Sequence, residues 1–97
     1  MSAPKAPEFQ FTVLYFASAA SYTHKQYDFL PGPLLFSDLP DVLERKYPGI
    51  TEKILESCAY TVNLDYVDME EEYAKEQIGL RVSPGDEVAI IPPVSSG

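Results

Sequence analysis

The run FQFTVLYFA at residues 9–17 decides the fold, because it is dense in aromatic and β-branched residues. Alternate positions from Phe9 to Tyr15 are all apolar, and the positions between them are partly apolar. This pattern predicts a strand near the centre of a sheet, covered on both faces. A second such run, EVAII at residues 87–91, comes near the other end of the chain and stops at two prolines, which cannot donate to a strand ladder.

The segment between these two strands predicts one main helix over residues 37–47. Ser37 or Asp38 is a good N-cap, and Pro40 falls in the first turn, where a missing N–H costs nothing. Leu39, Val42 and Leu43 form one apolar stripe. A short second helical turn over residues 51–56 follows, with Thr51 as its cap.

Shorter segments complete the order of elements. Residues 26–30 alternate and predict a second strand, joined to the first by a wide loop over residues 18–25. Residues 58–67 predict a third strand, with Asn63 and Asp65 as possible turn residues inside it. Residues 68–77 are acidic and predict a solvated loop or a frayed helical turn, and residues 80–82 a short extended piece.

This order predicts an α+β protein with a mixed sheet and one main helix across one face. A right-handed crossover places the last strand parallel to the first, side by side at the centre of the sheet. That arrangement is the β-grasp, or ubiquitin-like, fold. We expect a disordered lead-in over residues 1–8, the β-grasp domain over residues 9–93 and a flexible tail over residues 94–97.

Composition limits the class of protein. The 97 residues suit one domain, with 45% hydrophobic and 23% charged residues. Seven Lys and Arg against fifteen Asp and Glu give a net charge of −8. Such a chain repels phosphate backbones and anionic lipids, so we expect no nucleic acid and no membrane among its partners, and favour a basic protein. The single cysteine and the absence of a signal-peptide pattern predict a cytoplasmic protein.

The chain carries little of the chemistry of an autonomous enzyme. His24 is the only histidine and has no nearby cysteine, so we expect no metal site. Cys58 begins an apolar stretch and is interpreted as a small buried residue rather than a nucleophile. The acidic residues 65–76 lack the glycine-punctuated pattern of a calcium loop, and we interpret them as a solvated face. No phosphate-binding or nucleophile motif is present.

The C-terminal tail is the distinctive feature. Two prolines hold its first steps extended, and the chain then continues without a bulky side chain to a glycine. A glycine carboxylate on such a projection can enter a narrow channel, which suits a chain end that is itself the reacting group. The tail residues are Pro92, Pro93, Val94, Ser95, Ser96 and Gly97.

The stretch GDEVAIIPPVS at residues 85–95, with glycine last, closely resembles the end of the molybdopterin synthase small subunit family. Members of that family are sulfur carriers with a ubiquitin-like fold. Residues 62–67 resemble the third strand of the family and residues 11–17 its first strand. The similarity runs in order over most of residues 9–97.

The resemblance implies a mechanism. An E1-like activating enzyme would adenylate the carboxylate of Gly97 with ATP, and sulfur would then replace AMP to leave a thiocarboxylate. The tail would insert into the large synthase subunit, where its sulfur converts cyclic pyranopterin monophosphate to molybdopterin. The chain would be a non-catalytic subunit of a heterotetrameric synthase, with no activity alone, no stably bound cofactor and only a transient glycyl adenylate as bound nucleotide.

One departure concerns the chain end, because the family normally ends in two glycines and Ser96 stands at the penultimate position here. Either the native chain ends at Gly97, or one further glycine follows it. We favour the further glycine, since Ser96 would otherwise put a Cβ in the narrowest part of the channel.

The resemblance also implies an apolar docking surface near the tail. We expect Ile91 and Val94 to form it, and Phe11 or Tyr15 to extend it. Acidic residues at 86 and 87 would meet basic residues at the rim of the partner.

Two alternatives stay open. One is a carrier of the same fold for thiamine or for tRNA thiolation and protein modification, which the Pro92-Pro93-Val94 sequence argues against. The other is a β-grasp interaction module without tail chemistry.

Overall fold

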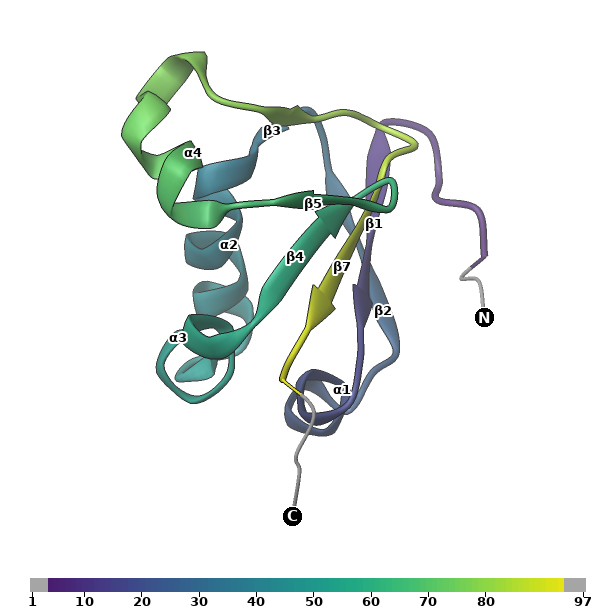
Figure 1. The fold of residues 1–97 in the computed structure, drawn as a ribbon. Coiled ribbons are helices and arrows are strands. Elements are labelled where there is room, and N and C mark those ends of the chain that lie inside the picture. Colours follow the sequence, from purple (N-terminus) through teal and green to yellow (C-terminus); the bar gives the residue numbers. More distant parts are fainter. Residues whose placement is uncertain (1–3, 94–97) are drawn as a thin grey trace.

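The computed structural model describes residues 4–93. Its main sheet has five strands in the order β2-β1-β7-β4-β5. Strands β1 (Gln10–Tyr15) and β7 (Glu87–Ile91) lie side by side and parallel at the centre, with Val13 opposite Val88 and Tyr15 opposite Ile90 (Figure 1). The central parallel pair and the β-grasp fold predicted from the two apolar runs are therefore confirmed.

Antiparallel strands flank this pair on both sides. Strand β2 (Tyr27–Pro31) pairs with β1, and β4 (Ala59–Val62) pairs with β7. Strand β5 (Asp65–Val67) pairs with β4 and forms the other edge. Two further short strands, β3 (Leu34–Leu35) and β6 (Arg81–Val82), pair with each other in a separate two-stranded sheet.

The main helix α2 (Leu39–Lys46) crosses one face of the sheet, as predicted (Figure 1). It follows a 3-10 turn, η1 (Phe36–Asp38), and Pro40 lies in its first turn. Leu39 and Leu43 are fully buried against the sheet. The buried core draws on the sheet, on α2 and on neighbouring segments: Phe11, Val13, Tyr15, Ala19, Leu30, Phe36, Leu39, Leu43, Ile50, Ile54, Leu55, Tyr60, Val62, Val82, Val88 and Ile90.

The turn after α2 is held by Glu44 rather than by Thr51. Helix α3 (Ile50–Lys53) begins after Gly49, and η2 (Leu55–Ser57) follows it. The Glu44 carboxylate accepts hydrogen bonds from the backbone N–H of Gly49 at 2.7 Å and of Thr51 at 3.0 Å. A side chain of the preceding helix therefore caps α3, which corrects the prediction that Thr51 is the cap.

Residues 18–25 are not the wide loop that the sequence predicts, because Ser18–Thr23 form helix α1. The Thr23 hydroxyl donates to the carbonyl of Ala19 at 3.0 Å, and Ala19 is fully buried. Burial of this small residue and the side-chain bond to the backbone stabilise a six-residue helix that is too short to be stable alone.

Residues 58–67 form a hairpin instead of one strand. Strands β4 and β5 turn at Asn63 and Leu64, whose φ values of 50° and 75° are both positive. This backbone matches the tight turns that join twisted antiparallel strands. The Asn63 amide donates to Asp86 at 3.1 Å and its oxygen accepts from the Glu87 N–H at 3.0 Å, so the hairpin tip is attached to the start of β7.

The acidic segment is a capped helix, α4 (Met69–Lys75), followed by η3 (Glu76–Ile78). The Asp68 side chain accepts from the N–H of Glu70 at 2.9 Å, as an N-cap does. Glu72 is buried and accepts from Leu80 N–H at 2.6 Å and from Lys75 Nζ at 2.9 Å. Part of the segment predicted as a solvated face is therefore structural.

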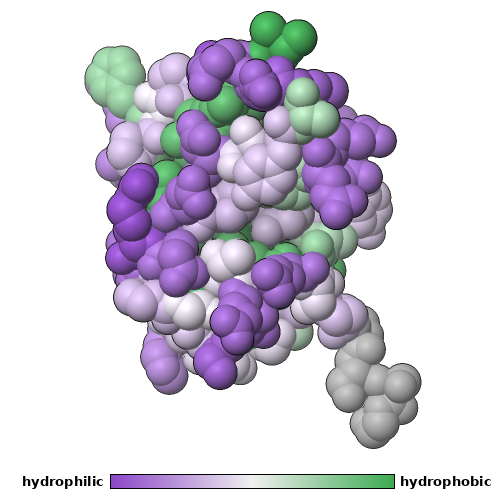
Figure 2. All heavy atoms as spheres, turned by 90° about the vertical axis from the view of Figure 1, so that its left-hand side faces the viewer, coloured by the Kyte–Doolittle hydropathy of each residue, from purple (hydrophilic) through white to green (hydrophobic). Residues whose placement is uncertain are grey.

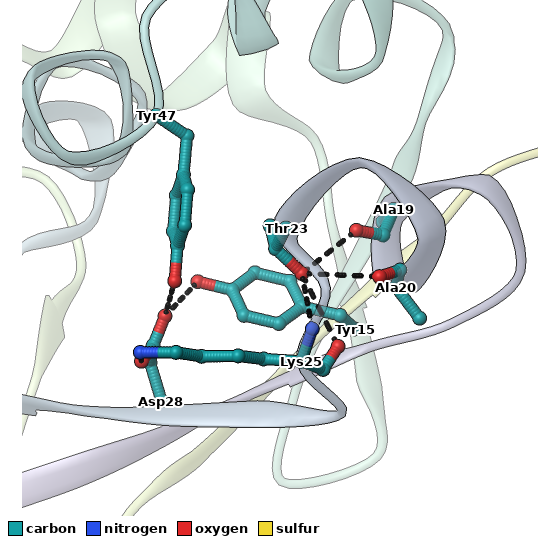
Figure 3. Close-up of polar contacts among 7 residues, drawn as sticks. All are labelled: Tyr15, Ala19, Ala20, Thr23, Lys25, Asp28 and Tyr47. Atoms are coloured by element: carbon teal, nitrogen blue, oxygen red, sulfur yellow. Dashed lines mark hydrogen bonds and ion pairs between the residues drawn. The ribbon is translucent and has the colours of Figure 1, made fainter.

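One buried carboxylate joins three elements below the main helix (Figure 3). Asp28 of β2 accepts hydrogen bonds from Tyr15 of β1 at 2.8 Å and from Tyr47, just after α2, at 2.5 Å. Lys25 Nζ donates to its other oxygen at 3.1 Å. Burial alone would raise the pKa of Asp28, but the bonds from Tyr47, Tyr15 and Lys25 outweigh it and lower the pKa below its ordinary value of 3.8.

Asp28→Asn tests this contact. The variant keeps the shape of the side chain but loses the charge that three donors share, so we expect a loss of about 2 kcal/mol in the free energy of unfolding at pH 7. Because the native pKa is lowered, the contribution is present above pH 3.8 and is lost as the pH falls through the native pKa. Urea unfolding between pH 7 and pH 2 should show the difference shrinking in acid. Asp65→Asn, at an exposed position, is the control, and an equal loss in both variants would contradict this role.

Candidate functional site

The base of the tail lies at the middle of the sheet. Strand β7 ends at Ile91, which is opposite Ala59 of β4, and on the other side the Phe16 N–H donates to the Ile90 carbonyl at 3.3 Å. Pro92 is buried and Pro93 is exposed. The chain therefore leaves the domain from between two paired strands, which fixes where any tail begins. The predicted tail residues Val94, Ser95, Ser96 and Gly97 lie outside the described residues.

One face of the sheet contributes no residue to the main core cluster, although Ala89 on it is buried, and we call it the open face. Because side chains alternate along a strand, residues that neighbour core positions point to this side. Phe16 at the end of β1 is 41% exposed, and Ile91 is half-buried. Further aromatic residues lie toward the edges, with the rings of Tyr27 and Phe29 5.2 Å apart and Tyr66 78% exposed. The open face comprises Leu14, Phe16, Tyr27, Phe29, Ala59, Tyr66, Ala89 and Ile91.

The structure places three of the residues predicted for docking, and the docking role of Ile91 stays a prediction. Ile91 lies on the open face beside the tail, as expected. Phe11 is 0% exposed and Tyr15 is 3% exposed, so neither can extend a surface patch. They belong to the fully apolar side of β1, which packs against the helices. The alternation of side chains along the first strand could have indicated this. The less apolar side of the strand, with Leu14 and Phe16, is the side that remains accessible.

The two acidic residues expected at a partner's rim differ in their roles. Asp86 accepts from the Ser83 N–H at 2.8 Å and from the Asn63 amide at 3.1 Å, so its carboxylate holds the turn before β7. Glu87 is half-buried at the start of β7, at the opposite end of the strand from Ile91. Neither residue stands next to the base of the tail.

Cys58 is half-buried and His24 is exposed. Burial raises the pKa of the Cys58 thiol from 9.0 to about 11, and its Sγ donates to the Ile54 carbonyl at 3.0 Å. The thiol is therefore protonated at neutral pH, as expected of a small packed residue. His24 is exposed and caps the C-terminus of α1 with a φ of 60°. Within residues 4–93, no three His, Cys, Asp or Glu side chains are grouped as a metal site would require, and no helix is long and apolar enough to cross a membrane.

Comparison with known proteins shows which family this chain belongs to. The family model described as ThiS family matches residues 13–97. The chain is 53% identical over 97 residues to the molybdopterin synthase sulfur carrier subunit of Pyrenophora tritici-repentis, with 100% of both chains covered. It is 30% identical over 93 residues to the protein of that name in Homo sapiens, covering 94% of this chain and 98% of the human one.

Solved structures show the same fold at lower identity. The crystal structure of SAMP1 from Haloferax volcanii superposes with a TM-score of 0.69 at 20% identity, covering 91% of this chain and 99% of the other. A chain from the complex of subunits 1 and 2 of the molybdopterin-converting factor of Helicobacter pylori gives a TM-score of 0.60 at 22% identity, with 91% and 99% covered. At these identities the similarity supports the ubiquitin-like fold.

A β-grasp domain whose last strand runs through the centre of its sheet defines the class of ubiquitin-like proteins. Within that class, this chain belongs to the ThiS family. The resemblance to the molybdopterin synthase small subunit family is confirmed by two relatives named molybdopterin synthase sulfur carrier subunit. They are 53% and 50% identical to this chain over its full length.

The raised pKa of Cys58 can be tested by alkylation with iodoacetamide at pH 8. The pKa lies two units above its ordinary value, so the thiolate fraction and the alkylation rate should be about 100-fold lower than for the same chain in 8 M urea. Mass spectrometry of the alkylated chain gives both rates. Equal rates in the folded and unfolded chain would show that the thiol is not protected.

Proposed function

We propose that this chain is the sulfur carrier subunit of molybdopterin synthase, and that its C-terminal glycine carboxylate is the group that carries sulfur. The observation that carries the proposal is the identity of 53% over the whole length with a protein of that name. The geometry supports it, since β7 delivers the chain end from the middle of the sheet, next to an accessible apolar face.

The chemistry requires partners that supply what this chain lacks. A carboxylate is a poor electrophile, so an E1-like enzyme activates it with ATP, forming an acyl adenylate and releasing pyrophosphate. A sulfur nucleophile then attacks the acyl carbon and AMP leaves, which produces the thiocarboxylate. No side chain of residues 4–93 needs to react, in agreement with the protonated thiol of Cys58.

The open face is the docking surface in this proposal. Its apolar side chains begin at Ile91, beside the tail, and extend through Phe16 and Leu14. A large subunit that receives the tail in its active site therefore meets an apolar surface at the same place, and burying it supplies the binding energy. There the carried sulfur would convert cyclic pyranopterin monophosphate to molybdopterin.

Sulfur uptake is the direct test of the carrier function. The matching activating enzyme, ATP and a sulfur donor are incubated with the chain ending at Gly97 and with a chain that has one further glycine. We expect the extended chain to exchange one terminal oxygen for sulfur, and the chain ending at Gly97 to take up none. Intact-mass and fragment spectra locate the change, and Cys58 should stay unmodified. Uptake by the chain ending at Gly97 would show that Ser96 is tolerated, whereas no uptake by either chain would contradict the carrier function.

Docking through the open face is tested with a matched pair of charge insertions. Ile91→Lys places an ammonium group in the apolar contact and should weaken binding to the large subunit by about 100-fold, as loss of a central interface residue does. Ile78→Lys, at a residue that is 89% exposed on η3, should leave binding unchanged. Calorimetric titration gives both affinities, and circular dichroism checks that both variants fold. Equal affinities would place the docking surface elsewhere.

A further inference from the structure

A cleft of about 890 Å³ opens beside the open face, between helix α4 and the β4–β5 hairpin. Its inner wall is apolar and includes Leu55, which is buried, and Val67 and Met69, which are half-buried. We call it the acidic cleft because its rim carries four carboxylates, Glu56, Asp68, Glu70 and Glu71. The proposed carrier chemistry does not use the cleft.

All charged side chains that line the cleft are negative. No lysine, arginine or histidine of the described part of the chain lines it. Asp68 is engaged as the N-cap of α4, whereas Glu56, Glu70 and Glu71 are exposed and point their charge toward solvent. The pKa of Tyr73 is raised first by burial and then by the nearby carboxylates of Asp41 and Asp38, which agrees with a negative potential on this side. Figure 2 looks onto this side of the molecule, where hydrophilic residues dominate and paler, less polar residues lie between them.

Exposed tyrosines complete the lining. Tyr66 of β5 is 78% exposed and Tyr73 of α4 is 50% exposed, and both line the cleft. An aromatic face attracts a cation, and it packs well against the aliphatic stem of a lysine or arginine. Apolar walls, tyrosine faces and a ring of carboxylates together suit a side chain with an aliphatic stem and a positive end.

The cleft is continuous with the docking surface. Tyr66 lines it and also belongs to the open face, and Ala59, another lining residue, is opposite Ile91 at the base of the tail. A protein that covers the open face and holds the tail therefore reaches the mouth of the cleft without a long extension.

We propose that the acidic cleft receives a lysine- or arginine-bearing segment of the large synthase subunit, as a second contact beside the open face. This inference rests on the proposed function for the identity of the partner. The carboxylates attract the segment during association, and the tyrosines and the apolar wall retain it after docking.

The test removes the charges without changing the size of the side chains. Glu70→Gln/Glu71→Gln lowers the negative charge of the cleft by two, and Glu8→Gln/Glu76→Gln removes the same charge from exposed positions outside it. By surface plasmon resonance with the large subunit, we expect the cleft variant to associate about fivefold more slowly at 20 mM salt than the control variant. The difference should disappear at 500 mM salt, where surface charges are screened.

The retention step is tested separately at Tyr73, which lines the cleft but does not belong to the open face. Tyr73→Ala should raise the dissociation rate by about tenfold, and Tyr73→Phe, which keeps the aromatic face, should restore it. If the wild-type chain binds and all cleft variants bind with unchanged rates, the cleft proposal is overturned and the carrier function stands. If the wild-type chain does not bind the large subunit at all, both proposals are overturned.

Discussion

The hydrogen-bonded parallel pairing of β1 with β7 is the constraint on which the other features depend. Two parallel neighbours cannot be joined by a tight turn, so the chain between Tyr15 and Glu87 has to include a crossover over one face of the sheet. Helix α2 lies in that crossover and its apolar stripe covers the core side. Strands β2 and β4 then flank the central pair, and the other face stays uncovered. The position of the tail and the accessibility of the apolar face beside it both follow from this one pairing.

The acidic residues of the chain have two separate roles. Some carboxylates accept hydrogen bonds from backbone N–H groups or buried hydroxyls, as Asp28, Glu44 and Glu72 do. Each of these three has a pKa lowered by its donors, so it stays ionised in the folded protein. The remaining exposed carboxylates give the surface its charge, and several of them gather around the cleft. Net charge alone does not distinguish the two groups.

The sequence predicts those parts of the fold that rest on strong local patterns. The central strands and α2 are set by apolar periodicity, and both were predicted with nearly correct bounds. Helix α1 was missed because its stability comes from burial of Ala19 and from the Thr23 bond, which no local pattern shows. The hairpin turn was only half predicted, since Asn63 favours a positive φ but Leu64 does not.

Only part of the candidate site could be predicted from the sequence. The location of Ile91 beside the base of the tail follows directly from the position of the last strand, and its docking role stays a prediction. Phe11 and Tyr15 were assigned to the wrong face, because hydrophobicity identifies an apolar side but does not state whether a helix or a partner covers it. The acidic cleft was not predicted, since its walls include the β5 arm of the hairpin and helix α4, where the sequence predicts one continuous strand and a solvated loop or frayed helical turn.

The central position of β7 has a mechanical consequence. A pulling force on the chain end acts along β7. The force shears the hydrogen bonds to β1 and to β4 at the same time. At an edge strand, by contrast, such bonds can open one after another. A strand held on both sides in this way resists extraction far better than an edge strand. Under the proposed carrier function, the domain would serve as an anchor each time a partner draws its end into a narrow channel and releases it.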